Sequence, residues 1–263
     1  MGTAGGVEPG ERPKVWGAAG VFTAVAFVAA AALGAVQPVA GVPPEVVQLT
    51  QFGPAVGVGV VALYRRRQTR ELLRGGDERR ADRAVALLAT AGLIVAVSVL
   101  AYWPASGDVG FIRPGALHHP FVLIAAAQLV GACGEEIGWR CFLQPLLRTR
   151  VGTLVSSVTV GVVWGAWHVP VFAQAPAYAA GFLVATVGMS LVLGVALDGT
   201  GGTYRLLLAG GFHALVNLGL LLFMDVEFGA VLPMVSFGLA CLLAGLVWAG
   251  RHASAPRAPI PGW

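Results

Sequence analysis

Six strongly polar residues lie inside apolar stretches of this sequence, and together they could carry acid–base chemistry. They are Glu135, Glu136, Arg140, His168, His213 and Asn217. Because an ionised carboxylate in hydrocarbon is costly, acids in such stretches face a protein interior or a water-filled cavity, and they mark functional sites. A buried carboxylate can act as a general base on water, and imidazole and amide groups can stabilise the oxyanion that forms.

Helical spacing divides these residues into two groups. Glu136 and Arg140 are four residues apart, so they share one helix face and can form an ion pair. Glu135 is rotated from Glu136 by about 100° around the same helix. His213 and Asn217 are also four apart and place two polar groups on one face. The sequence therefore predicts a structural role for Glu136 and a reactive role for Glu135.

The depth of the polar residues in their helices is consistent with one site. If the helix that carries Glu135 continues to Arg148, then Glu135 and His168 each lie about 20 Å from the same side of the membrane. On the same rise per residue, His213 and Asn217 lie about 12 and 18 Å deep. We therefore expect these four side chains to meet at one level.

The composition indicates the elements that position them. Hydrophobic residues make up 57% of the 263 residues, charged residues make up 11%, and the mean hydropathy is +0.77. A soluble domain has roughly 25% charged residues, so the sequence predicts a polytopic membrane protein. The formal charge of +4 then reports membrane topology, and nucleic-acid binding is not expected. Three cysteines without CxxC spacing predict neither a disulfide framework nor a zinc knuckle.

Eight apolar windows are long enough to cross a bilayer, which takes about 20 residues. We therefore expect an all-α fold, a bundle of eight transmembrane helices around a buried polar site. An arginine-rich segment at 65–83 reads as a solvated cytoplasmic loop. The expected spans are 15–36, 46–64, 84–103, 119–139, 154–172, 178–197, 206–224 and 230–249.

The distribution of basic residues predicts the orientation. With the N-terminus inside, nearly all Lys and Arg residues fall on the cytoplasmic side, and Arg113 falls outside. Asp108, Asp225 and Glu227 then lie in outer loops. We expect a multi-pass protein of the cell membrane with both termini cytoplasmic, and the high Arg, Ala and Gly content suggests a bacterial source. The expected parts are a flexible segment 1–14, a membrane domain 15–250 and a flexible tail 251–263.

Three motifs resemble those of a known family. Residues 135–140 read EEIGWR and fit EExxxR, residues 164–170 read WGAWHVP, and residues 213–217 read HALVN and fit HxxxN. Their order and spacing over about 119–224 resemble the CAAX protease and bacteriocin-processing (CPBP, or ABI) family of intramembrane proteases, which includes the type II CAAX prenyl endopeptidases. The one departure is Trp164, where the family motif usually has Phe four residues before its His.

The resemblance implies a hydrolase in which Glu135 activates water. His168, His213 and Asn217 would position that water or stabilise the oxyanion, and Glu136, Arg140 and Trp164 would support them. The expected substrate is a membrane-associated peptide or protein in the lipid bilayer. We expect Trp164 to change the packing and to preserve the chemistry.

Three alternatives stay open from the sequence. Two His, a Glu and an Asn could hold a divalent metal such as zinc, with Glu135, His168, His213 and Asn217 as candidate ligands. The same buried cluster could serve a small-solute transporter, because buried acids and histidines also form proton relays. A non-catalytic membrane adaptor or immunity protein is the third alternative.

Overall fold

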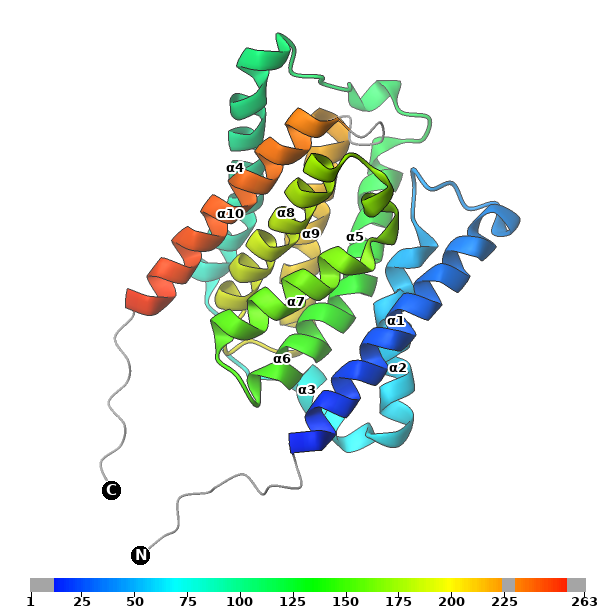
Figure 1. Cartoon of the computed structure of the whole chain (residues 1–263), viewed down its shortest axis with the longest axis vertical. Coiled ribbons are helices and arrows are strands. Elements are labelled where there is room, and N and C mark those ends of the chain that lie inside the picture. The colour runs from blue at the N-terminus through cyan, green and yellow to red at the C-terminus, as the bar shows by residue number, and fades with distance from the viewer. Residues whose placement is uncertain (1–11, 224–229, 255–263) are drawn as a thin grey trace, which may run out of the picture.

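The computed structural model describes residues 12–223 and 230–254, which form a bundle of helices (Figure 1). Within these two ranges the chain contains helices and turns and no β-strand, which confirms the all-α prediction. The helices are α1 (Arg12–Ala40), α2 (Gly53–Tyr64), α3 (Arg66–Arg74), α4 (Ala81–Ser106), α5 (Phe121–Gly138), α6 (Gln144–Arg148), α7 (Thr153–Trp167), α8 (Pro176–Ala196), α9 (Gly202–Phe223) and α10 (Val231–Ser254).

The eight expected spans correspond to eight apolar helical segments of two lengths. Among the described residues, six segments are long and apolar enough to cross a membrane by themselves. The other two, Leu49–Tyr64 and Thr153–Trp167, are shorter. The first and last helices extend slightly past the expected limits of the membrane domain, 15–250. Helix α1 begins at Arg12, and α10 ends at Ser254. Asp225 and Glu227 lie outside the described residues.

The helix that carries the two glutamates is longer than its apolar window. After Gly138 the chain makes a π-helical turn, Trp139–Leu143, and then continues as α6 to Arg148. This continuous path confirms the prediction that the helix reaches Arg148. The next span is shorter than its window, because α7 ends at Trp167 just before the histidine. Pro170 accounts for that end, since a proline inside a helix removes a backbone hydrogen bond.

The arginine-rich segment differs from the expected solvated loop because it contains the helix α3. Thr69 on this helix is buried, and Leu72 and Leu73 pack against the core. Gly75 then adopts φ +57°, a left-handed conformation that favours glycine. The segment remains attached to the bundle because the following N–H, that of Gly76, donates to the carbonyl of Thr200.

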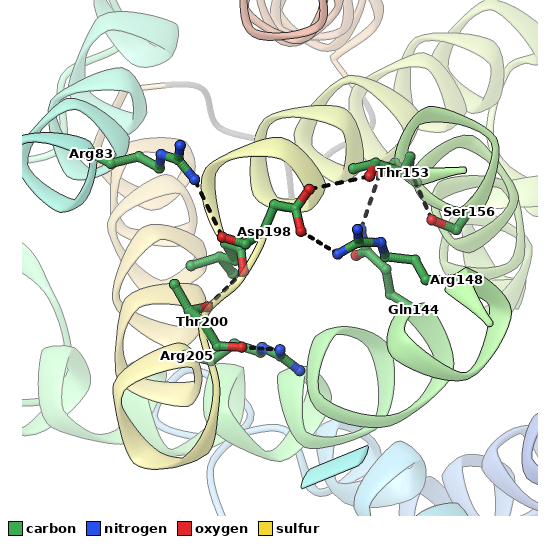
Figure 2. A network of polar contacts seen from close by, with 10 residues as sticks. Arg83, Gln144, Arg148, Thr153, Ser156, Asp198, Thr200 and Arg205 are labelled. Atoms are coloured by element: carbon green, nitrogen blue, oxygen red, sulfur yellow. Dashed lines mark hydrogen bonds and ion pairs between the residues drawn. The ribbon is translucent and has the colours of Figure 1, made fainter. Parts of the chain in front are cut away.

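A polar network joins several helices at the end of the bundle that carries α3 and α6 (Figure 2). Its centre is Asp198, which follows α8 and whose carboxylate accepts from Arg148 and Thr153. Arg83 donates to the carbonyl of Asp198 at 3.3 Å, and Arg205 donates to that of Thr200. These contacts link α4, α6, α7 and α9 to one turn.

Glycines permit close packing between α7, α8 and α10. A Cβ added at Gly161 would lie 2.6 Å from the Cα of Val187, and one at Gly188 would lie 2.4 Å from the carbonyl carbon of Cys241. Gly161 and Gly165 are four residues apart, a spacing of small residues that permits close approach of helix backbones. The helix that packs against them is α8.

We predict that Gly188→Ala destabilises the bundle, because the added methyl group meets backbone atoms of α10 that cannot rotate away. The expected loss is about 1–3 kcal/mol in the free energy of unfolding, measured by equilibrium unfolding in mixed micelles. Gly92→Ala is the matched control. Gly92 also lies in a helix, no atom lies within 4 Å of its added Cβ, and alanine raises helix propensity. Equal stability of the two variants would contradict close packing of α8 against α10 at Gly188.

Candidate functional site

The four residues expected to carry chemistry line one cavity of about 470 Å³. Glu135, His168, His213 and Asn217 come from α5, the residue after α7, and α9. The volume lies within the range of ligand-binding pockets, roughly 300–1,000 Å³. The structure thus brings together groups that are up to 82 residues apart in the sequence. Gln51 and Gln128 line the same cavity.

Glu135 is held by two side chains that donate to its two oxygens. The indole N–H of Trp164 donates to Oε2 at 2.8 Å, and the amide of Gln51 donates to Oε1 at 3.3 Å. Glu135 is 2% exposed, so each donor replaces hydration that burial removes. Donation to both oxygens fixes the plane of the carboxylate toward the cavity.

Glu136 faces a different set of partners from those of Glu135. Its Oε2 lies 3.3 Å from Nε of Arg140, the pair expected from the spacing of the two residues. Its Oε1 lies 3.0 Å from Nδ1 of His213, a contact that the sequence did not predict. All three side chains are almost completely buried. The two adjacent acids therefore occupy separate environments, and Glu136 connects α5 to α9.

The hydrogen bonds of the two histidines define which ring nitrogen remains for the cavity. Nδ1 of His168 lies 2.9 Å from the carbonyl oxygen of Trp164, and Nδ1 of His213 lies against the carboxylate of Glu136. Carbonyl and carboxylate oxygens only accept, so Nδ1 carries a proton in both rings. In each residue Nε2 is then the nitrogen that can meet a molecule in the cavity.

Asn217 extends the polar wall toward α5. Its Nδ2 donates to Oε1 of Gln128 at 3.1 Å, which leaves the second N–H of the amide for another acceptor. Gln128 lies on the Glu135 side of α5, seven residues before it. The sequence did not single out Gln51, which lies near the start of the second apolar window together with Gln48 and Thr50.

Close approach of α5 to the segment that begins α2 places Gln51 beside Glu135. A Cβ at Gly131 would lie 2.1 Å from Oε1 of Gln51, and a Cβ at Gly138 would lie 2.4 Å from Cβ of Pro54. Gly134 lies between these two glycines, and all three pack against the segment 51–54. Larger residues there would push Gln51 away from the carboxylate.

Trp164 contacts both groups of the site. Besides its bond to Glu135, its ring lies 4.9 Å from the guanidinium carbon of Arg140, a cation–π distance. The rings of Trp164 and His213 pack edge to face with centroids 5.1 Å apart. A phenylalanine could make the ring contacts but has no N–H to donate to Glu135. Trp164 therefore changes the packing, as expected, and in addition donates a hydrogen bond to Glu135.

The donor groups do not fit a metal centre. Among the described residues, no three His, Cys, Asp or Glu side chains are grouped so that they could hold a metal ion. The chemistry proposed below therefore uses no metal ion.

Comparison with known proteins places this site in a family context. Residues 117–219 match the family model described as type II CAAX prenyl endopeptidase Rce1-like. This range contains the three motifs, and the match confirms the resemblance that they indicated. The site residues from Glu135 to Asn217 all fall inside the matched range, whereas Gln51 lies outside it.

Curated relatives match over a longer part of the chain. The lysostaphin resistance protein A of Staphylococcus aureus strain MRSA252 is 21% identical over 243 residues, which cover 87% of this chain and 58% of that protein. The proteins of the same name from strains bovine RF122 / ET3-1 and Newman match with the same identity and coverage. The chain thus spans a little over half the length of the curated relatives it matches.

We predict strong energetic coupling between Glu136 and Arg140. Removing one partner of a buried ion pair costs about 3–5 kcal/mol because the other charge stays buried. Arg140→Met should therefore be strongly destabilising, and adding Glu136→Gln should cost far less than the sum of the two single changes. A double-mutant cycle by equilibrium unfolding in micelles measures this coupling.

The exposed pair Arg67–Glu71 is the matched control, because it has the same spacing and a distance of 2.9 Å. Its cycle should give a much smaller coupling energy, because solvent screens an exposed ion pair. Similar coupling energies at the two sites would show that the buried pair does not stabilise the fold as described.

Proposed function

We propose that this protein is an intramembrane endopeptidase that depends on Glu135. The proposal is supported by the match of residues 117–219 to the Rce1-like type II CAAX prenyl endopeptidases. The observation that carries the proposal is the shared cavity of Glu135, His168, His213 and Asn217, beside an adjacent acid that is separately paired. The substrate is a peptide or protein associated with the membrane. Its peptide bond is hydrolysed by water inside the cavity.

In the proposed reaction, Glu135 takes a proton from a water molecule as the water oxygen attacks the carbonyl carbon. The carbonyl π-electrons move to oxygen and form a tetrahedral oxyanion. Glu135 then passes the proton to the leaving nitrogen as the C–N bond breaks. The two donors on its oxygens, Trp164 and Gln51, keep the carboxylate oriented throughout these transfers.

The two histidines take different roles in this proposal because their Nδ1 partners differ. His213 donates to a carboxylate, so an imidazolium there is stabilised by Glu136 on one side and by the oxyanion on the other. Its Nε2–H and the remaining N–H of Asn217 bind the oxyanion. His168 donates to a neutral carbonyl, and its Nε2 lone pair accepts a hydrogen bond from the attacking water.

The proposed location is the cell membrane, with both ends of the chain in the cytoplasm. The six long apolar helices among the described residues fit a multi-pass protein, and the curated relatives reported above are bacterial. In Figure 1 the described ends of the chain lie at the same end of the bundle as α3, which carries much of the arginine. The positive-inside rule supports a cytoplasmic position for that end.

A non-catalytic role remains the second candidate. The curated relatives are named for resistance to lysostaphin, and that name describes a trait and no reaction. An adaptor would use the buried pair of Glu136 and Arg140 for stability and would not need a base at Glu135. The two functions therefore differ in what a change at Glu135 does.

We predict that Glu135→Gln abolishes peptide cleavage, because an amide cannot accept the proton from water. Purified protein is reconstituted in liposomes, and a peptide library is analysed by mass spectrometry for products. Loss of a general base costs about 10²–10⁴-fold in rate. Glu71→Gln, the same change on the exposed face of α3, is the control and should cleave at the wild-type rate. Equal processing by wild type and Glu135→Gln would leave the adaptor as the better reading.

We also predict that a metal chelator leaves cleavage by the wild-type protein unchanged, because the donor groups in the cavity do not fit a metal centre. The same liposome assay is run with and without the chelator. Inhibition that is reversed by adding zinc would contradict the metal-free reaction.

We predict that Trp164→Phe lowers kcat and largely preserves KM. The ring contacts remain, but Glu135 loses one charge-assisted hydrogen bond of about 1.5–3 kcal/mol, so a loss of roughly 10- to 100-fold is expected. Trp248→Phe is the matched control. Its N–H donates to Oγ1 of Thr90 on α4, away from the cavity. An equal loss in both variants, or a rise in KM alone, would contradict an orienting role of Trp164.

A further inference from the structure

The cavity opens at one end of the bundle. Its outer part is lined by the connection between α1 and α2, by the connection between α4 and α5, and by the last turn of α9. Exposed residues from the two connections mark the mouth: Pro44, Gln48, Ala116 and His118. In Figure 1 these connections lie toward the upper end of the bundle, opposite the start of α1 and the end of α10.

A contact between the two connections defines this mouth. Glu45 accepts a hydrogen bond from the backbone N–H of His118 at 3.1 Å, and its other oxygen lies 3.2 Å from Nδ1 of His119. The cavity is therefore entered beside a bridge between 41–48 and 107–120. The inner wall behind it offers amide groups, and Leu117 and Leu220 provide apolar surface.

The opposite end of the bundle is basic. The network around Asp198 joins α4, α6, α7 and α9 there (Figure 2). Within the described chain, all arginines other than Arg113 and the buried Arg140 lie toward this end, either on α3, beside it, or at the near ends of neighbouring helices. None of them lines the cavity that contains Glu135.

These two observations indicate on which side of the membrane the cavity opens. Arginines close to the ends of membrane spans accumulate on the cytoplasmic face, so the basic end is the cytoplasmic one and the mouth faces away from it. About 20 Å of helix, from Glu135 to Arg148, separates the carboxylate from the basic end. The residues of the network at that end do not line the cavity, whose lining extends instead to the mouth.

We propose that the site is reached from the non-cytoplasmic side of the membrane. Its substrate is an uncharged, extended segment of a peptide or membrane protein presented on that side, and it enters between the connections 41–48 and 107–120. This inference rests on the proposed function for the identity of the reaction, but the side of entry follows from the position of the mouth. Amide groups of Gln48 and Gln128 suit a peptide backbone, and the leucines suit apolar side chains.

Labelling of single added cysteines tests the side directly. Ala116→Cys places a thiol at the mouth, and Arg70→Cys places one on the exposed face of α3. The native cysteines, of which Cys141 and Cys241 are buried, are replaced by alanine. Spheroplasts are treated with a membrane-impermeant maleimide before and after lysis. The Ala116→Cys protein should react in intact spheroplasts, and the Arg70→Cys protein should react only after lysis. The reverse pattern, or labelling of both before lysis, would overturn the inference.

A second experiment separates the side of entry from the reaction itself. The peptide library is added to sealed right-side-out or inside-out vesicles that contain wild-type protein or Glu135→Gln. Products should form in right-side-out vesicles with the wild type and at least 10-fold more slowly in inside-out vesicles. Faster cleavage in inside-out vesicles would overturn the side of entry and leave the endopeptidase intact. Absence of cleavage in both, with the expected labelling, would overturn the endopeptidase and leave the side of entry standing.

Discussion

The buried charge of Glu136 is the constraint on which the rest of the site depends. A carboxylate with no exposed surface persists in an apolar bundle only if its charge is compensated. Arg140 supplies the opposite charge from the same helix, and His213 forms a hydrogen bond with one of the two oxygens from α9. These contacts fix how α5 and α9 face each other. The neighbouring Glu135 then faces the cavity, because adjacent residues on a helix point about 100° apart.

Backbone packing sets the partners of Glu135. Gly131 and Gly138 let the start of α2 approach α5 closely, and this brings Gln51 to the carboxylate. On the other side, α7 stops immediately after Trp167, so His168 is released from helical geometry while Trp164 remains in the last turn and donates to Glu135. The carboxylate is thus held by groups from two separate segments, and each depends on a local backbone feature.

The parts of the site that follow helical periodicity could be predicted from the sequence, and those that depend on tertiary contacts could not. The pair of Glu136 and Arg140 requires only four-residue spacing on one helix. The bond from Trp164 to Glu135 depends on the distance between α5 and α7, which no local pattern encodes. Gln51 was missed because its partner Glu135 lies on another helix, and no local spacing links the two residues. The eight apolar segments were found by composition, but α3 was not, since its few apolar residues are interrupted by arginines.

The two ends of the bundle differ in structure, because one carries a network of paired arginines and the other carries the mouth of the cavity. At the basic end, Asp198 gathers Arg148 and Arg83 onto one turn, so that many cations near the membrane surface are also bound to backbone or carboxylate. At the other end, Glu45 bridges two connections and leaves a cavity beside them. The residues of the basic end do not line the cavity that contains Glu135, so the water needed for the proposed hydrolysis would enter beside Glu45.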